Sequence, residues 1–172
     1  MIRQAQHEDI DSIMTIVGDA QRALAELGID QWQDGYPTRD IILEDIDLKQ
    51  GYVYEDATEG VVGYSAIVLT GEEAYNQIKG SEWNTSDDYI VVHRLCVRNV
   101  VRRKGVASKL MQFAITKAQE AKLTGFRIDT HNGNVRMLSL LEAFGFKHIG
   151  RILYDSGERE AFDLKLDLNN TL

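Results

Sequence analysis

The chain has 172 residues, 44% of them hydrophobic and 27% charged, which is typical of one domain folded around a single core. One cysteine, Cys96, excludes an intrachain disulfide, and a net charge of −8 argues against nucleic-acid binding, which needs a basic surface. The N-terminal residues lack the apolar core of a signal peptide, and no apolar run is long enough to span a bilayer. We therefore expect a single cytoplasmic domain, residues 1–172, without metal, membrane or nucleic acid as a partner.

The first half of the chain predicts a strand, two helices and two further strands. Apolar residues at helical spacing begin near Asp9, and Gly28 is suited to end that helix. Thr38 is a typical N-cap for the second helix, after a loop broken by Gly35 and Pro37. The expected elements are a strand at 2–5, a helix at 9–28, a loop at 29–37, a helix at 38–50, and strands at 52–55 and 61–69.

The second half opens with a polar, acidic segment at 70–88 that has no clear period. Residues 89–97 (YIVVHRLCV) are rich in β-branched residues and predict a central strand. The elements expected after it are a helix from about 106, a strand at 126–130, a helix at 135–144 closed by Gly145, and a hairpin of 147–153 with 161–166. This order predicts a mixed α/β fold around one sheet.

The turn between the central strand and the following helix is strongly basic. Its cations precede Gly105, and no acidic residue interrupts them; they are Arg98, Arg102, Arg103 and Lys104. A helix start carries unpaired N–H groups and partial positive charge, so cations there are unfavourable unless an anion binds. Glycine lets a backbone approach such an anion closely. The alternative is a basic surface turn, but the pattern favours a phosphate site.

Residues 102–107 match the motif Arg or Gln, two residues, Gly, one residue, Gly or Ala. A strand at 128–130, Asn134 and then Gly145-Phe146 follow in the expected order. In these features the chain resembles the GNAT superfamily of N-acetyltransferases, and the segment 29–37 (IDQWQDGYP) is similar to a bacterial subgroup of uncharacterised members. The resemblance implies transfer of an acetyl group from acetyl-CoA to an amine. It also implies an α/β (α+β) fold with a mostly antiparallel sheet of about seven strands and about four helices.

The resemblance implies a set of residues that bind coenzyme A. Backbone groups of Leu95, Cys96 and Val97 would pair with the pantetheine arm and polarise the thioester carbonyl. Asn134 would contact the cofactor from the next helix, although a plain N-cap also explains it. The pyrophosphate would be surrounded by Arg102, Arg103, Lys104, Gly105, Val106, Ala107 and Ser108.

The family's usual general acid is missing from this sequence. Many members carry a tyrosine four residues before the glycine of Gly-Phe, and Leu141 occupies that position here. Tyr154, near the turn of the last hairpin, is the substitute that we consider. Cys96 is not expected to act as a nucleophile, since apolar strands often bury a free cysteine.

Three residues are candidates for the base that deprotonates the amine. His93 is a candidate because histidine is the usual general base near neutral pH, although a partly buried histidine bonded to the backbone also explains it. Asp129 matches a position where some members carry a catalytic carboxylate; the alternative is an ion pair with Arg94 or Arg127. Glu73 lies in the acidic segment, where a solvated charge is the simpler explanation.

The resemblance implies that the loop between the first two helices borders the acceptor site. Trp32, Asp34 and Tyr36 lie there, and aromatic rings with carboxylates suit a cationic amine; Glu73 would add a further charge. The alternative is that Trp32 and Trp83 cover the core while the acids face water. The sequence leaves open a polyamine, an aminoglycoside or a protein amino group.

Two other nucleotide-binding classes do not fit, because neither G-x-x-x-x-G-K-[ST] nor G-x-G-x-x-G is present. The remaining rival is a protein of the same fold that binds acyl-CoA as a regulatory module without turnover. We expect the chain to act as a monomer or a homodimer.

Overall fold

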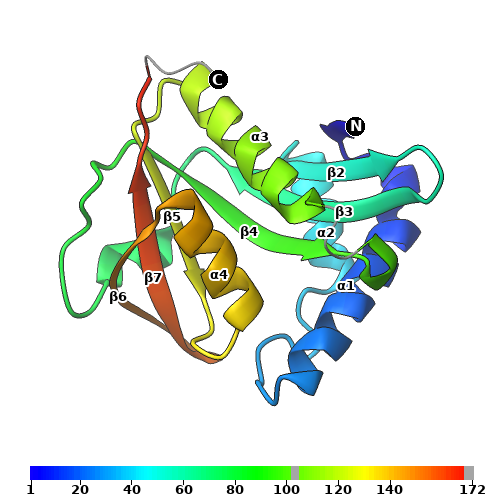
Figure 1. Cartoon of the computed structure of the whole chain (residues 1–172), viewed down its shortest axis with the longest axis horizontal. Coiled ribbons are helices and arrows are strands. Elements are labelled where there is room, and N and C mark those ends of the chain that lie inside the picture. The colour runs from blue at the N-terminus through cyan, green and yellow to red at the C-terminus, as the bar shows by residue number, and fades with distance from the viewer. Residues whose placement is uncertain (102–104, 169–172) are drawn as a thin grey trace. The chain divides into compact units, whose positions relative to one another are not determined.

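The computed structural model describes residues 1–101 and 105–168 (Figure 1). Its strands are β1 (Ile2–Gln4), β2 (Gly51–Asp56), β3 (Gly60–Val68), β4 (Tyr89–Val97), β5 (Gly125–Thr130), β6 (Lys147–Tyr154) and β7 (Gly157–Lys165). The α-helices are α1 (Ile10–Glu26), α2 (Arg39–Asp47), α3 (Val106–Glu120) and α4 (Val135–Phe144). Short 3-10 turns lie at η1 (His7–Asp9), η2 (Glu73–Gln77) and η3 (Asn99–Val101).

The strands form one seven-stranded sheet in the order β1-β2-β3-β4-β5-β7-β6. β4 and β5 pair in parallel at Tyr89–Val91, whereas β1–β2, β2–β3, β5–β7 and β6–β7 are antiparallel. The predicted fold class and element order are confirmed. β4 has the bounds that its apolar, β-branched composition predicted.

The chain is divided into two compact units. The first comprises Met1–Ile67 and Val92–Phe113, and the second comprises Val68–Val91 and Ala114–Leu172. We refer to them as the first and the second unit.

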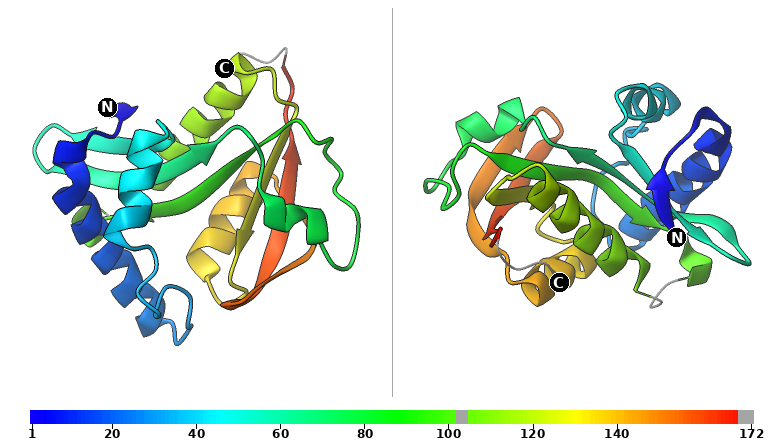
Figure 2. Two further views of the ribbon diagram at one scale, coloured as in Figure 1. Left: turned by 180° about the vertical axis from the view of Figure 1, so that it is seen from behind. Right: turned by 90° about the horizontal axis from the view of Figure 1, so that it is seen from above.

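In the first unit, helices cover both faces of the strands (Figure 2). One cluster joins the apolar faces of α1 and α2 to inward side chains of the sheet such as Val53, Tyr64 and Cys96. The other places Val106 and Leu110 of α3 against Val62. The Thr38 hydroxyl accepts a hydrogen bond from Ile41 N (3.4 Å) and caps α2, as predicted.

In the second unit, β5, β6 and β7 form an antiparallel group with α4 on one face. Phe126 of β5 meets Phe146, which follows α4, edge to face at 5.0 Å between ring centroids. Gly145 ends α4 in a left-handed conformation with φ 82°, as predicted. The segment 70–88 contributes η2 to a separate buried cluster with Tyr89, Val91, Ile152 and Ala161.

The segment 70–88 differs most from expectation, because its lack of periodicity gave no reason to expect docked structure. It contains η2, it adds a β-bridge between Lys79 and Arg151, and it buries Tyr75 completely. No α-helix within residues 1–101 and 105–168 is long and apolar enough to cross a bilayer.

Candidate active site

The start of α3 has an open, glycine-led backbone. Gly105 has φ 73°, and a Cβ placed on it would meet no atom of residues 1–101 and 105–168 within 4 Å. Its carbonyl accepts the hydrogen bond of Lys109 N at 3.0 Å, which closes the first turn of the helix. The N–H groups of that turn have no carbonyl partner within a helix and can bind an anion. Arg102, Arg103 and Lys104 lie outside the described residues.

A second glycine brings the helix start close to the sheet. A Cβ on Gly63 of β3 would lie 2.7 Å from Val106 Cγ1, so any larger residue would push the helix away. Leu95 and Val97 of β4 pack against the buried cluster that contains Val106. Leu95, Val97 and Val106, three residues predicted to bind the cofactor, are therefore neighbours in the first unit.

Cys96 points to the opposite face of β4 and lies buried in the cluster beneath α1 and α2. Burial raises the pKa of its thiol to about 12, with Arg94 acting in the opposite direction. These observations support its interpretation as a core residue. The family resemblance also implies that its backbone lies beside the cofactor, and that prediction stands.

This burial predicts that Cys96 is inert in the folded protein. At pH 8 we expect the thiol to react with a disulfide reagent roughly a thousandfold more slowly than a free cysteine, because so little thiolate is present. The reaction should reach full rate in denaturant. Rapid labelling of the native chain would contradict the burial of Cys96.

A buried ionic network supports the predicted acceptor loop of the first unit. Arg94 donates from Nε to Asp45 Oδ2 at 2.8 Å and from Nη2 to Asp45 Oδ1 at 2.5 Å. Asp45 Oδ2 also accepts the Tyr64 hydroxyl at 2.7 Å, and burial is the main cause that raises the pKa of Tyr64. Arg94 Nη1 donates to the Tyr36 hydroxyl at 2.8 Å, so α2, β4 and the loop are joined by one guanidinium.

The loop side chains that we predicted to bind substrate are brought together. The rings of Trp32 and Tyr36 lie 6.2 Å apart, and Asp34 Oδ1 accepts the Tyr36 backbone N–H at 3.2 Å. Asp34 is exposed, whereas Trp32 packs partly on the core. Trp32 therefore covers part of the core, which agrees with the alternative explanation given for this residue.

In the second unit, two predicted catalytic residues share a hydrogen bond. The Tyr154 hydroxyl donates to Asp129 Oδ2 at 2.9 Å. The same carboxylate oxygen accepts the hydroxyl of Tyr75 at 2.8 Å, a contact that no pattern in the sequence anticipates. Asp129 forms no ion pair with Arg94 or Arg127 in the described part of the chain, so that alternative was wrong. Their carboxylate partners are Asp45 and Asp87.

The other candidates of the second unit have simpler surroundings. Asn134 caps α4, since its Oδ1 accepts Met137 N at 3.3 Å, and it also donates to Thr130. Glu73 is exposed on η2, as a solvated charge would be. Leu141 is fully buried, so the usual position of the family's acid holds only an apolar side chain.

His93, in the β4 portion of the first unit, is half-buried. Its role as a base stays a prediction.

Across residues 1–101 and 105–168, no group of three or more His, Cys, Asp or Glu side chains is arranged to hold a metal ion.

Comparison with known proteins agrees with these features. The sequence model of the acetyltransferase (GNAT) family matches residues 13–146. A GNAT-family acetyltransferase from Streptococcus agalactiae has 33% identity and a TM-score of 0.87, with 97% of this chain and 95% of that chain covered.

More distant structures share the fold. A GNAT-family acetyltransferase from Listeria monocytogenes has 20% identity and a TM-score of 0.74, with 96% of this chain and 94% of that chain covered. Ard1 from Thermoplasma volcanium has 20% identity and a TM-score of 0.69, with 97% of each chain covered. A search of curated proteins finds no match.

The family match spans the glycine-led start of α3, the β4 strand before it and the Asp129 region after it. The chain therefore belongs to the GNAT family of acetyltransferases, enzymes that transfer the acyl group of an acyl-CoA.

Proposed function

We propose that this enzyme acetylates a primary amine by direct attack on the thioester in a ternary complex. The observation that carries the proposal is the hydrogen bond between Tyr154 and Asp129, 25 residues apart in the chain, which pairs a proton donor with a carboxylate. A half-buried carboxylate and a phenol in contact form a pair that can move protons in both directions.

Coenzyme A would be held by the first unit. Support comes from Gly105, where an added Cβ would meet no described atom within 4 Å, and from the close packing of Val106 on Gly63 of β3. The predicted phosphate-binding residues are Arg102, Arg103, Lys104, Gly105, Val106, Ala107 and Ser108, with Asn134 as a further contact. The backbone of Leu95, Cys96 and Val97 would pair with the pantetheine arm.

Acetyl-CoA, when bound, supplies an activated acetyl group whose thiolate leaves readily. Asp129 accepts a proton from the substrate ammonium, which frees the nitrogen lone pair for attack. Tyr154 would give its phenolic proton to the departing sulfur and would regain a proton from Asp129 or from solvent. Of the two protons that the ammonium loses, one ends on the thiol of coenzyme A and the other in solvent.

His93 is the second candidate for the base. Asp129 is favoured because two hydroxyl donors hold its carboxylate in place. On the acceptor side we propose Trp32, Asp34 and Tyr36, with Glu73 as a weaker candidate. An aromatic pair beside an exposed carboxylate suits a cationic amine.

The test is a transfer assay with acetyl-CoA against spermidine, kanamycin and a peptide with a free amino terminus. Intersecting initial-rate plots are expected for a ternary complex, and parallel plots would contradict direct attack. Binding of coenzyme A with no transfer to any amine would favour the regulatory module.

Replacing Tyr154 by phenylalanine should lower kcat by roughly 10- to 100-fold, because the proton donor is lost. The dissociation constant of coenzyme A should stay within about twofold, since the aromatic ring remains. Tyr52→Phe is the matched control, because Tyr52 is a half-buried tyrosine whose ring packs on Phe113 in the first unit. Equal turnover in Tyr154→Phe and the wild type would remove Tyr154 from the mechanism.

A further inference from the structure

Tyr75 is a buried tyrosine to which no family motif gives a role. It lies on η2 within the segment 70–88, and its exposed fraction is 0%. Its hydroxyl donates to Asp129 Oδ2, the same oxygen that accepts Tyr154. In the described part of the chain, no donor contacts Asp129 Oδ1. Two phenols therefore fix one oxygen of the carboxylate, and the other is left for an incoming proton donor.

The segment that carries Tyr75 is held by a buried cation. Arg127, with 2% exposure, stacks on the rings of Trp83 (4.6 Å) and Tyr89 (3.8 Å). Its guanidinium donates to Thr85 Oγ1 at 3.0 Å, to Thr85 O at 2.8 Å and to Ser86 O at 2.9 Å. Arg127 and Asp129 are two residues apart on β5 and so face the same side of the strand.

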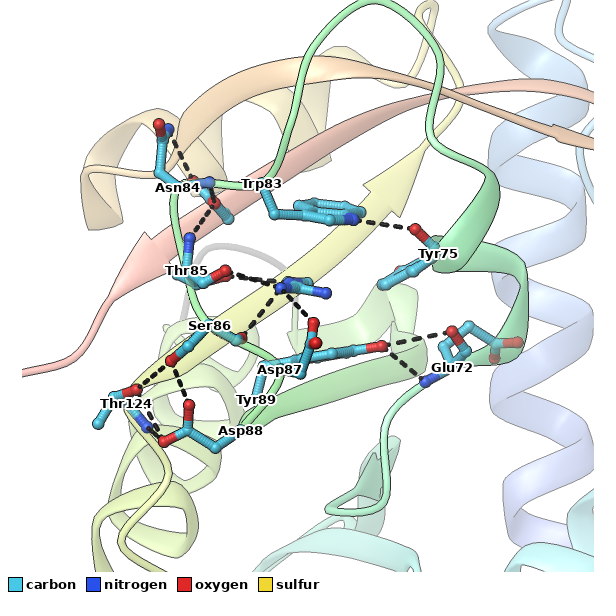
Figure 3. Close-up of polar contacts among 12 residues, drawn as sticks. Glu72, Tyr75, Trp83, Asn84, Thr85, Ser86, Asp87, Asp88, Tyr89 and Thr124 are labelled. Atoms are coloured by element: carbon cyan, nitrogen blue, oxygen red, sulfur yellow. Dashed lines mark hydrogen bonds and ion pairs between the residues drawn. The ribbon is translucent and has the colours of Figure 1, made fainter.

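Further contacts secure both ends of the segment (Figure 3). Asp163 accepts the backbone N–H groups of Asn84 and Thr85 at 2.7 and 3.1 Å. At the other end, Tyr89 exchanges hydrogen bonds with the backbone of Glu72. An exposed polar loop would not need this number of buried anchors.

Trp83 connects the anchored part of the segment to Tyr75. The Trp83 indole Nε1 donates to Tyr75 O at 2.9 Å, and the two rings lie 5.2 Å apart (Figure 3). Tyr75 is therefore held at its backbone by Trp83 and at its hydroxyl by Asp129. Burial, reinforced by Asp129, raises the pKa of Tyr75 well above its ordinary value, so its phenol remains a donor at every working pH.

We propose that the segment 70–88 is a docked arm whose role is to hold Tyr75 on Asp129, and that Tyr75 is a positioning residue for proton transfer. The inference rests on the proposed function of Asp129. It deepens that function by adding a hydrogen bond that arrives from outside the family's motifs. A carboxylate fixed in one orientation needs less reorganisation when it accepts a proton.

The test is a double-mutant cycle of Tyr75→Phe and Asp129→Asn, measured as kcat with acetyl-CoA and the best amine of the panel. Tyr75→Phe alone should lower kcat about tenfold and leave the affinity for coenzyme A unchanged. In the Asp129→Asn background the same change should alter kcat by less than about twofold, because a residue that acts through another shows non-additive effects.

Tyr64→Phe is the matched control. It too removes a buried phenol that donates to a buried carboxylate, here Asp45, in the first unit. Tyr64→Phe should change kcat by the same factor in the wild-type background and in the Asp129→Asn background, whatever the size of that factor. Trp83→Phe is a second test variant, because it removes the donor to Tyr75 O and keeps an aromatic ring at this position. Its effect should also vanish in the Asp129→Asn background.

The outcomes separate the two proposals. A wild type that transfers no acetyl group would overturn the proposed function itself. Active wild type with equal factors for Tyr75→Phe in both backgrounds would show a purely structural role and overturn the positioning inference. An unchanged kcat in Asp129→Asn would overturn it as well. Thermal unfolding of each variant confirms that the compared proteins are folded, and Trp83→Phe decides the question if Tyr75→Phe does not fold.

Discussion

Gly105→Asp is expected to weaken the binding of coenzyme A by roughly a hundredfold, or about 3 kcal/mol. The glycine directly precedes α3 with φ 73°, and a Cβ on it would meet no described atom within 4 Å, so the new side chain would occupy the place proposed for the diphosphate. Its carboxylate would repel the phosphates in a site where the helix start otherwise favours negative charge. Calorimetric titration of the folded variant with coenzyme A measures the loss.

Gly60→Asp provides a closely matched control. Gly60 also has a positive φ, 70°, and a Cβ added to it would meet no described atom within 4 Å, but it begins β3 and does not precede a helix. Both substitutions therefore add the same backbone strain and the same charge. We expect Gly60→Asp to keep its affinity for coenzyme A. Equal affinities for the two variants would show that the start of α3 does not hold the phosphates.

Arg127→Ala is expected to lower the free energy of unfolding by about 3–5 kcal/mol, a large part of the stability of an ordinary domain. The change removes the three hydrogen bonds to Thr85 and Ser86 and leaves a cavity between the rings of Trp83 and Tyr89. Arg127→Lys should lower the free energy of unfolding by a smaller amount than Arg127→Ala, because an ammonium keeps the charge but loses the planar stacking. Urea denaturation followed by circular dichroism gives the values.

Arg151→Ala is the control for loss of an arginine. Arg151 is 57% exposed in its side chain and pairs with Glu158, which is also exposed, and with Glu160, whose side chain is partly buried. Exposed pairs of this kind contribute less than about 1 kcal/mol. A loss at Arg127 no larger than the loss at Arg151 would mean that the buried guanidinium does not hold the segment 70–88.

Local sequence signals were sufficient to predict most of the helices and strands. Thr38 and Gly145 act within one helical turn, and the apolar run of β4 needs no knowledge of its neighbours, so these features could be predicted from sequence. The Asp129–Tyr75 contact joins positions 54 residues apart, and the Asp45–Arg94 pair joins positions 49 apart. Such contacts depend on packing, which leaves no periodic pattern.

Buried charge was the one available clue to these contacts. Arg94 interrupts an apolar strand, and Arg127 lies in a strand that is otherwise buried, so each required a partner. The sequence does not indicate which carboxylate pairs with each arginine. For this reason Asp129 was wrongly considered as the partner of Arg94 or Arg127. Tyr75 gave no such signal, because a tyrosine in a polar segment is ordinary on a surface.

The burial of Cys96 makes the chain convenient for fluorescence spectroscopy. Its only native thiol is hidden, so a cysteine introduced at exposed Glu73 would be the single position that a maleimide dye can reach. A dye on η2 would report whether the segment 70–88 detaches from β5 during the catalytic cycle, with no need to delete Cys96 first.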